Sequence, residues 1–269
     1  DVVIYKFDDS STAFKDDFYT TFGGTEVPQQ TDGGLNDSGS LDYDGGGGTQ
    51  AWFSTAKYSG IDVGDSVTAS AYFFMNPSGA TQVSSVKMGF TDDPNSTAAN
   101  NAAPNSGNWI YFGNWSWDYA TSVNTELRSS QGEVATTASL TGQNVASWYL
   151  QSITLEKASA TAYDVNWSLD RVDSSGSLIE NGTSGSSSNF TFSALGSDLY
   201  FYIGLENASS GAKYEAIDNL TMTGTGVTIV GSSVPEPSTY ALIFGCLGLG
   251  LVLMGRRKQN SWITSKTRS

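Results

Sequence analysis

The sequence predicts an all-β protein, an antiparallel sandwich followed by a single C-terminal transmembrane helix. Glycine is abundant, with 30 of 269 residues, and much of it stands in runs with Ser, Thr, Asn and Asp. That composition is typical of short strands joined by many turns. Several segments alternate apolar and polar residues with the period of two that a strand requires. No segment before residue 239 has a long helical period.

Candidate strands are rich in β-branched and aromatic residues and are bounded by turn residues. In the stretch from Leu199 to Leu205, for example, the odd-numbered residues are all apolar and would face one side. Many short strands at this spacing predict a sandwich, which we place in residues 1–223. The candidate strands are Val2–Phe7, Ala51–Ala56, Ser66–Met75, Val83–Thr91, Trp109–Trp115, Ser147–Glu156, Tyr163–Asp170, Ser188–Ser193, Leu199–Glu206 and Tyr214–Thr223.

Charge and reactive side chains exclude several function classes. The net charge is −14, and it is −19 over residues 1–255 because five basic residues lie in the C-terminal tail. A body this acidic repels nucleic acid, since phosphate binding needs clustered Lys or Arg. The chain has no histidine, and its one cysteine is Cys246. Ser-His-Asp catalysis, zinc-thiolate sites and disulfides in the body are therefore excluded.

The C-terminal region predicts export. Residues 239–255 form an uncharged, mainly apolar stretch of 17 residues, near the lower limit for spanning a bilayer core of about 30 Å. In lipid such a stretch is helical, because every backbone polar group needs an internal partner. Arg256, Arg257 and Lys258 follow directly and are expected to stay cytoplasmic, which places the body on the outer side. We also expect a signal peptide to have been removed before Asp1.

A short motif precedes the apolar stretch, after a linker at residues 224–233. Its two prolines flank one glutamate and favour an extended backbone. The motif consists of Val234, Pro235, Glu236, Pro237 and Ser238. Together with the apolar stretch and the basic cluster, over residues 234–258, it resembles the PEP-CTERM sorting signal of bacterial exported proteins. The cytoplasmic tail, residues 259–269, is longer than such signals usually carry.

The PEP-CTERM resemblance implies processing by an exosortase-type membrane enzyme near the Pro-Glu-Pro element, in bacteria that make extracellular polysaccharide. The expected location is an inner-membrane-tethered precursor and then the cell surface or extracellular matrix. The alternative is an ordinary single-span anchor with a proline-rich linker. Both interpretations place the body outside the cell.

The two ends of the body suggest a more specific fold. An opening Phe7-Asp8-Asp9 and a closing Ile217-Asp218-Asn219-Leu220 look like the first and last strands of concanavalin-like or galactose-binding-like jelly rolls. In those folds the terminal strands pair with each other. The resemblance therefore implies a jelly-roll sandwich with its first and last strands side by side.

Calcium is the one cofactor that the sequence suggests. The jelly-roll resemblance implies a candidate site near Asp9 and Asp218, and calcium prefers the oxygen ligands that Asp and Asn supply. The segment that begins at Asp42 starts like an EF-hand but lacks its later ligands, so we reject that motif. The alternative, which we favour, is that these residues fill turns and cap strand ends.

A dense aromatic segment is the candidate glycan site. On a strand, Trp109, Tyr111, Trp115 and Trp117 share one face. Solvent-facing rings can stack on sugars, and an acidic body does not oppose neutral glycans. The alternative, which we favour, is that this face is core, because aromatic residues dominate cores as well.

Two function classes remain. The favoured one is a structural or adhesive component of the envelope or polysaccharide matrix that contacts glycan and is not an enzyme. The other is a carbohydrate-active enzyme, a glycoside hydrolase or lyase, on the same scaffold. No two glutamates of the body stand two to four residues apart, which argues against the paired-carboxylate arrangement of jelly-roll glucanases.

Overall fold

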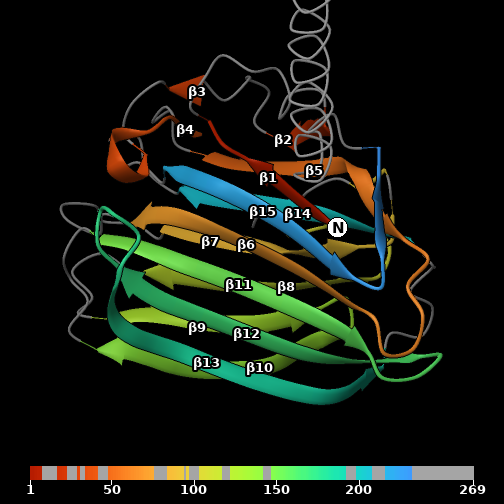
Figure 1. The fold of residues 1–269 in the computed structure, drawn as a ribbon. Helices are drawn as coiled ribbons and strands as arrows, with labels where there is room; N and C mark the ends of the chain where they lie inside the picture. The colour runs from red at the N-terminus through yellow and green to blue at the C-terminus, as the bar shows by residue number, and fades with distance from the viewer. Residues whose placement is uncertain are drawn as a thin grey trace, which may run out of the picture. The chain divides into compact units, whose positions relative to one another are not determined.

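The computed structural model describes residues 1–7, 17–22, 29–30, 34–41, 48–75, 84–93, 95–96, 103–116, 122–141, 147–191, 198–207 and 216–231. Within them the chain forms two antiparallel β-sheets that face each other (Figure 1). One short 3-10 turn, Leu35–Asp37, lies between strands of the first sheet. The prediction of an antiparallel all-β sandwich is confirmed for the described residues. The helix expected at residues 239–255 lies outside them.

Sheet A has the strand order β13-β12-β11-β6-β15-β4-β3, with β1 also paired to β15. The long strands of its centre are uninterrupted ladders, as between β11 and β6, where Ile153 pairs with Ala69. The strands of sheet A are β1 (Val2–Tyr5), β3 (Gln29–Gln30), β4 (Ser40–Leu41), β6 (Ser66–Met75), β11 (Ser147–Lys157), β12 (Ala162–Val172), β13 (Leu178–Thr191) and β15 (Ile217–Thr225).

Sheet B has the order β10-β9-β8-β7-β14-β5-β16, with β2 also paired to β5. In the centre of the sheet, Gly89 of β7 pairs with Tyr111 of β8 on one side and with Tyr202 of β14 on the other. The strands of sheet B are β2 (Phe18–Phe22), β5 (Gly48–Ser59), β7 (Ser84–Thr91), β8 (Trp109–Ser116), β9 (Ser122–Ser129), β10 (Gly132–Thr141), β14 (Asp198–Asn207) and β16 (Thr228–Val230).

The first strand lies beside β15, which contains the predicted closing segment at residues 217–220; one short strand, β16, follows it and pairs with β5 in sheet B. β1 pairs antiparallel with β15, with Val2 opposite Thr223 and Tyr5 opposite Leu220, and both strands are visible near the N-terminus in Figure 1. The expected pairing of the opening strand with the strand of the closing segment is therefore confirmed. The ladder between β15 and β6 is interrupted by a bulge between Asp218 and Thr221, which lets the chain at this end turn out of the regular pleat.

The main core fills the space between the two sheets. Alternating residues of β6, β11 and β12 meet alternating residues of β8, β7 and β14, as the period of two predicts. In β14 these are Leu199, Phe201, Ile203 and Leu205, the set predicted to face one side. Burial of this many aromatic and aliphatic side chains is the dominant stabilising term of the sandwich.

One polar pair crosses the main core. Asn114 of β8 donates its amide hydrogen bond to the side-chain oxygen of Gln151 on β11. The amide nitrogen of Gln151 in turn donates to the carbonyl oxygen of Phe112 at 2.7 Å. Both side chains are fully buried. Because a buried amide is costly without partners, this pair favours one alignment of the two sheets over others.

The structure also contains strands that the sequence pattern did not single out. β9 and β10 form a hairpin in sheet B, with Gly132 paired opposite Ser129. Of β13, Leu178–Thr191, the sequence pattern predicted only the end from Ser188 onward, because the strand is dominated by Gly, Ser and Asn. Residues of this kind have low strand propensity. The pairing of β13 with β12, a tertiary contact, is what holds them extended.

Candidate functional site

The predicted aromatic strand is part of a row of rings on the outer face of sheet B. Trp109 stacks on Tyr111 with ring centroids 5.5 Å apart, and Tyr111 meets Tyr202 edge-on at 6.4 Å. Tyr202 stacks on Phe53 at 5.5 Å, and Phe53 stacks on Tyr19 at 5.7 Å. These spacings lie in the range of favourable aromatic pairs. The row, here called the aromatic band, crosses sheet B from β8 to β2.

Most of the aromatic band is covered. The exposed fractions of Tyr111, Tyr202 and Phe53 are 0%, although these residues point away from the main core. Ala103 packs against them, and Trp109 and Tyr19 are only partly buried. The hydroxyl of Tyr19 also donates to the carbonyl oxygen of Ser96 at 3.3 Å. Ser96 and Ala103 therefore contact the band, and the band with Ala103 forms a second small core.

The four predicted glycan-contacting residues have different positions in the structure. Trp109 and Tyr111 lie on the same face of β8, as the strand period requires. Tyr111 is covered and Trp109 is partly exposed. The side chain of Trp115 and the whole of Trp117 lie outside the described residues. A sugar that approached this face would thus meet the ring of Trp109 before that of Tyr111.

Ionisable groups surround Tyr111. Its hydroxyl donates to Glu126 Oε1 at 2.8 Å, and Lys87 Nζ lies 5.7 Å from the centre of its ring. Glu126 also lies 3.5 Å from Arg128 Nε. Burial first, and then the charge of Glu126, raises the pKa of Tyr111 well above its ordinary value. Tyr111 is therefore a protonated hydrogen-bond donor at neutral pH.

Of the two predicted calcium ligands, only Asp218 lies within the described residues, and it is buried. Its Oδ2 accepts hydrogen bonds from the backbone nitrogen of Leu35 at 3.0 Å and from Ser38 Oγ at 2.7 Å. Its Oδ1 accepts from the backbone nitrogen of Asn219 at 2.6 Å. The carboxylate thus ties the turn at residues 34–38 to β15. Over the described part of the chain, no three His, Cys, Asp or Glu side chains gather as metal ligands.

The C-terminal signal is known from sequence only. The motif at Val234–Ser238, the apolar stretch at residues 239–255 and the basic cluster at Arg256–Lys258 all lie outside the described residues. Among the residues that are described, no helix has the length and apolar character needed to cross a membrane.

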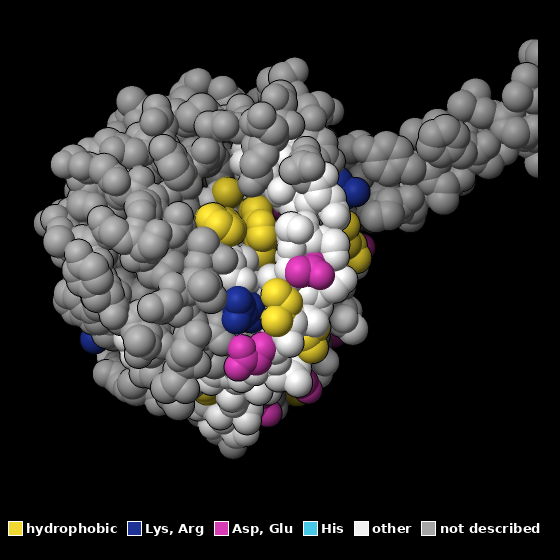
Figure 2. All heavy atoms as spheres, turned by 90° about the vertical axis from the view of Figure 1, so that its left-hand side faces the viewer, with side chains coloured by type: hydrophobic (Ala, Val, Ile, Leu, Met, Phe, Trp, Pro, Cys, Tyr) yellow, Lys and Arg dark blue, Asp and Glu magenta, His cyan; other side chains and the backbone are white. Residues whose placement is uncertain are grey.

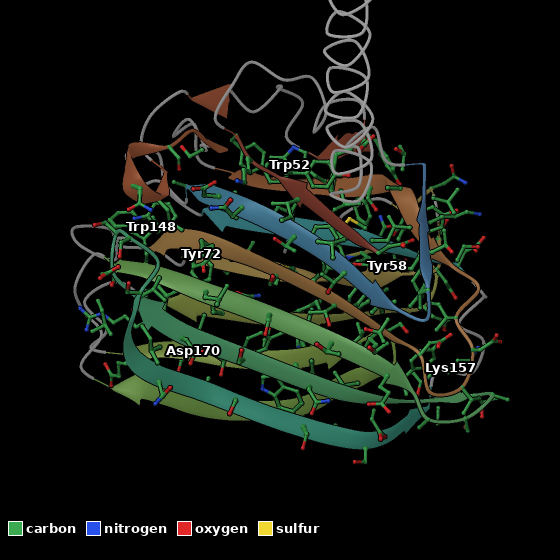
Figure 3. The ribbon with its side chains drawn as sticks, viewed as in Figure 1. Trp52, Tyr58, Tyr72, Trp148, Lys157 and Asp170 are labelled. Carbon is green, nitrogen blue, oxygen red and sulfur yellow. The ribbon has the colours of Figure 1, made fainter. Side chains whose placement is uncertain are left out.

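A second surface feature was not predicted from the sequence. A hollow of about 260 Å³ lies beside Tyr72, on the side of sheet A that faces away from the main core. It is lined by Lys6, Leu35, Asn36, Ser38, Tyr72, Ser175, Gly176 and Asn219. These residues come from five separate segments, so no sequence motif joins them. Figure 3 shows Tyr72 and Trp148 toward the same end of the sheet.

The end of the sandwich near the hollow also carries a small apolar cluster. Leu35, Trp148, Val172 and Ala216 form its buried part, and Tyr72 packs against it. Figure 2, which views the molecule from the left of Figure 1, shows apolar side chains gathered beside basic and acidic ones. The cluster fixes the ring of Tyr72 from behind.

Comparison with known protein families identifies the C-terminal signal. Residues 233–259 match the PEP-CTERM protein-sorting motif, as the sequence predicted. The chain therefore carries a signal of exported proteins that are anchored in a membrane before processing. A search of curated protein sequences finds no match.

Comparison with solved structures defines the class of the body. The seed lectin of Lotus tetragonolobus has a TM-score of 0.55 at 10% identity, over 87% of this chain and 100% of that chain. Lectin I-B4 of Griffonia simplicifolia has a TM-score of 0.53 at 10% identity, over 83% and 99%. The PL-14 alginate lyase of Aplysia kurodai has a TM-score of 0.54 at 11% identity, over 83% and 98%. At these identities the likeness concerns the fold alone.

Fold and signal together define a protein with a lectin-like β-sandwich body and a C-terminal PEP-CTERM sorting motif. The motif match begins at residue 233, and the last described strand of the sandwich ends at Val230. The signal therefore follows the body almost directly.

Proposed function

We propose that this protein is an adhesive component of the cell surface or extracellular matrix, released by an exosortase-type enzyme and in contact with extracellular polysaccharide. One observation carries the proposal: a sandwich of the lectin type is followed within a few residues by a PEP-CTERM sorting motif. An exported, acidic body repels nucleic acid but does not oppose a neutral glycan.

The surface at Trp109 supports contact with glycan. Its partly exposed ring is held by stacking on buried Tyr111, and the charged pair of Glu126 and Arg128 lies on the neighbouring strand. An apolar ring face beside polar groups matches a sugar, which has an apolar C–H face and a polar rim. Because Tyr111 is covered, Trp109 is the ring of this pair that would make the contact.

Processing is tested in the native host by replacing Pro235, Glu236 and Pro237 with alanine. The unchanged chain should be shortened and released, whereas the variant should stay longer and in the membrane fraction. A Ser232→Ala variant, just before the motif match, controls for substitution nearby and should be processed normally. Equal processing of all three proteins would contradict the role of the motif.

Glycan adhesion is tested with the full chain in a polyoxyethylene detergent, because alkyl-glycoside detergents would compete. On a glycan array, Trp109→Ala should lower the signal for bound glycans about tenfold, the expected effect of losing one aromatic contact. Leu178→Ala is the control, since Leu178 is an exposed apolar residue on β13 of the other sheet, and it should leave the signal unchanged. An unchanged signal with Trp109→Ala would exclude this surface.

The second candidate function is a carbohydrate-active enzyme. The observation that favours it is the gathering of Lys87, Tyr111 and Glu126, of which Lys87 is only 5% exposed. The carboxylate of Glu126, with a side chain 20% exposed, offers a proton acceptor that a substrate could reach, and buried Tyr111, which donates to it, would position it. Release of reducing ends or unsaturated sugars from polysaccharide by the wild-type chain, and its loss in Tyr111→Phe, would replace the adhesive proposal by this one.

A further inference from the structure

The hollow beside Tyr72 has a rigid polar frame. The backbone nitrogen of Asn36 donates to the carbonyl oxygen of Ser174 at 2.8 Å, which joins the turn at residues 34–38 to the turn between β12 and β13. Asp218 holds the same turn to β15 through Leu35 and Ser38. A site bounded by three hydrogen-bonded segments is preorganised and would lose little conformational entropy on binding.

Four polar side chains that line the hollow are not used by this frame. Within the described part of the chain, the side-chain amides of Asn36 and Asn219, the hydroxyl of Tyr72 and the ammonium of Lys6 form no hydrogen bond or ion pair. An amide presents a donor and an acceptor side by side, and Tyr and Lys add further donors. These groups match the hydroxyls of a polyol.

The hollow also has an apolar wall. The ring of Tyr72 forms one side of it, and Leu35 lies nearby. Gly176 has a φ of +80°, and a side chain there would lie 3.6 Å from the Tyr72 ring and hydroxyl. Glycine at this position therefore leaves space at the ring, where the C–H face of a sugar can stack.

Backbone conformation marks the same two asparagines. Among the described residues, Asn36, with a φ of 55°, and Asn219, with a φ of 48°, are the non-glycine residues with positive φ. Such a backbone favours glycine, and non-glycine residues there often mark functional sites. Although the chain has 30 glycines, asparagine and not glycine stands at both of these positions. Both asparagines line the hollow.

We propose that this hollow binds one neutral pyranose unit, with Tyr72 stacked on the sugar and the amides of Asn36 and Asn219 bonded to its hydroxyls. The volume of about 260 Å³ is near the lower end for ligand pockets, which suits a single ring. Lys6 brings one positive charge to the lining, whereas Asp218 and Asp173, which hold the two turns by hydrogen bonds, bring two negative charges nearby, so the balance of charge does not favour an acidic sugar. The inference rests on the proposed function for its choice of glycan as ligand.

The test measures binding of methyl glycosides of glucose, galactose and mannose, and of glucuronate, to the full chain in a polyoxyethylene detergent. Titration followed by saturation-transfer NMR gives the Kd. We expect at least one neutral glycoside to bind and Tyr72→Ala to weaken it about tenfold, the effect of one lost ring contact. Binding of none of the neutral glycosides, or tighter binding of glucuronate, would overturn the proposal.

The decisive variants are Asn36→Gly and Asn219→Gly. Glycine accepts a positive φ without strain, so each change removes an amide while the melting temperature should stay within about 3 °C. Each should weaken sugar binding about tenfold, the effect of losing hydrogen bonds in a small site. Full sugar affinity in both variants would show that the two asparagines only accommodate the positive φ and do not contact the sugar. That result would overturn the proposal.

Two further variants separate a neutral sugar in the hollow from a charged ligand and from a sugar bound at Trp109. Lys6→Gln keeps hydrogen-bond donors and should change the Kd less than about threefold, since no charge is involved; a tenfold loss would contradict a neutral ligand. The tenfold effect of Tyr72→Ala should be the same in the wild-type and in the Trp109→Ala background, because the two residues lie on different sheets; an effect that disappears in the Trp109→Ala background would place the sugar at Trp109 and overturn the proposal. If no sugar binds in the hollow but the full chain still binds glycan at Trp109, only this inference is overturned. If the chain is processed normally without the Pro-Glu-Pro element, only the proposed function is affected.

Discussion

The outer faces of the two sheets differ in what covers them. On sheet B, Tyr111, Tyr202 and Phe53 point away from the main core and are still fully buried. On sheet A, the corresponding central positions are hydroxyl residues that remain partly exposed. They form two rows across the strands: Thr221, Ser70, Ser152 and Ser168 in one, and Thr223, Thr68 and Thr154 in the other.

This difference shows how the same strand geometry gives two kinds of surface. The hydroxyls of sheet A pair across strands, with Thr68 and Thr154 at 2.8 Å and Ser152 and Ser168 at 2.8 Å. Such pairs are satisfied with no covering layer. The rings of sheet B would expose a large apolar surface to water, and further chain packs over them. Recognition of a ligand on the sandwich therefore depends on what lies over each face.

The largest expected effect would come from removing a ring of the aromatic band. Tyr202→Ala should lower the free energy of unfolding by about 3–5 kcal/mol, the cost of truncating a fully buried aromatic side chain. Ser152→Ala on the open face of sheet A should change it by less than about 0.5 kcal/mol. Thermal or urea unfolding measures both. Equal effects would break the distinction between a covered and an open face.

The hydroxyl of Tyr202 provides a matched control for that prediction. It is buried and has no hydrogen-bond partner among the residues that the structure describes, so Tyr202→Phe removes a polar group left unpaired there and keeps the ring. The phenylalanine variant should be as stable as the wild type or about 1 kcal/mol more stable. A loss comparable to that of Tyr202→Ala would mean that the hydroxyl, and not the ring, stabilises this face.

A smaller effect is expected at the anchor of the hollow on sheet A. Asp218→Ala leaves the donors at Leu35, Ser38 and Asn219 without their acceptor and should cost about 2–3 kcal/mol. The same position tests calcium, whose binding at Asp9 and Asp218 stays a prediction. If calcium binds there, a chelator should lower the melting temperature of the wild type but not of Asp218→Ala. An unchanged wild-type melting temperature would exclude the metal.

Gly89 of β7 lies between Tyr111 and Tyr202 at the centre of the aromatic band. A Cβ at this position would lie 2.0 Å from the carbonyl oxygen of Ile110 and 2.7 Å from the Cα of Tyr111. Gly89→Ala should therefore force β7 and β8 apart locally and cost about 1–3 kcal/mol. Ser168→Ala, on the open face of sheet A, is the control and should be close to neutral in the same unfolding measurement.

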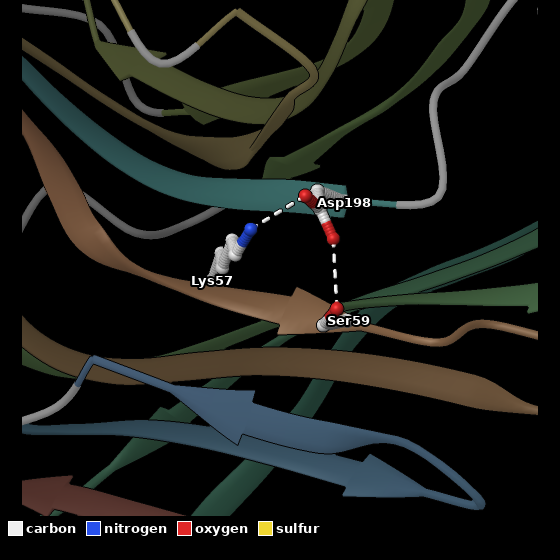
Figure 4. A network of polar contacts seen from close by, with 3 residues as sticks. All are labelled: Lys57, Ser59 and Asp198. Carbon is white, nitrogen blue, oxygen red and sulfur yellow. Dashed lines mark hydrogen bonds and ion pairs between the residues drawn. The ribbon is translucent and has the colours of Figure 1, made fainter.

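The smallest effect concerns a partly exposed ion pair of sheet B. Lys57 Nζ lies 2.6 Å from Asp198 Oδ2, and Ser59 Oγ donates to Asp198 Oδ1 at 2.8 Å (Figure 4). The hydrogen bond from Lys57 is the main cause that lowers the pKa of Asp198 below its ordinary value. The stabilisation is therefore present above the unfolded pKa of about 4 and is lost as pH falls through the lower folded value.

Melting temperatures of the wild type and Asp198→Asn measure this contribution. At about pH 7 the variant should melt at most about 3 °C lower, because exposed pairs stabilise weakly. The difference should shrink as the pH falls below about 4 and disappear once it has passed the lowered folded pKa of Asp198. A difference that grows on acidification would contradict the assignment.

The sequence by itself determined the all-β class and the sorting signal, whereas the pairing of β1 with β15 was expected only from the resemblance to jelly rolls. The alternation of Leu199, Phe201, Ile203 and Leu205 is a local pattern, and it predicted which side chains enter the main core. The signal at residues 233–259 is also local, because its parts follow one another along the chain. Patterns of this kind need no knowledge of what packs against them.

Only the tertiary structure decided which outer surfaces are open. Trp109 and Tyr111 share a face in sequence terms, yet Tyr111 is fully buried and Trp109 is not. The hollow beside Tyr72 joins Lys6, Asn36, Ser175 and Asn219 from distant parts of the chain. Burial of a side chain depends on all segments that pack near it, and most of those are far away in sequence. For that reason the strand period predicts the direction of a side chain but not its exposure.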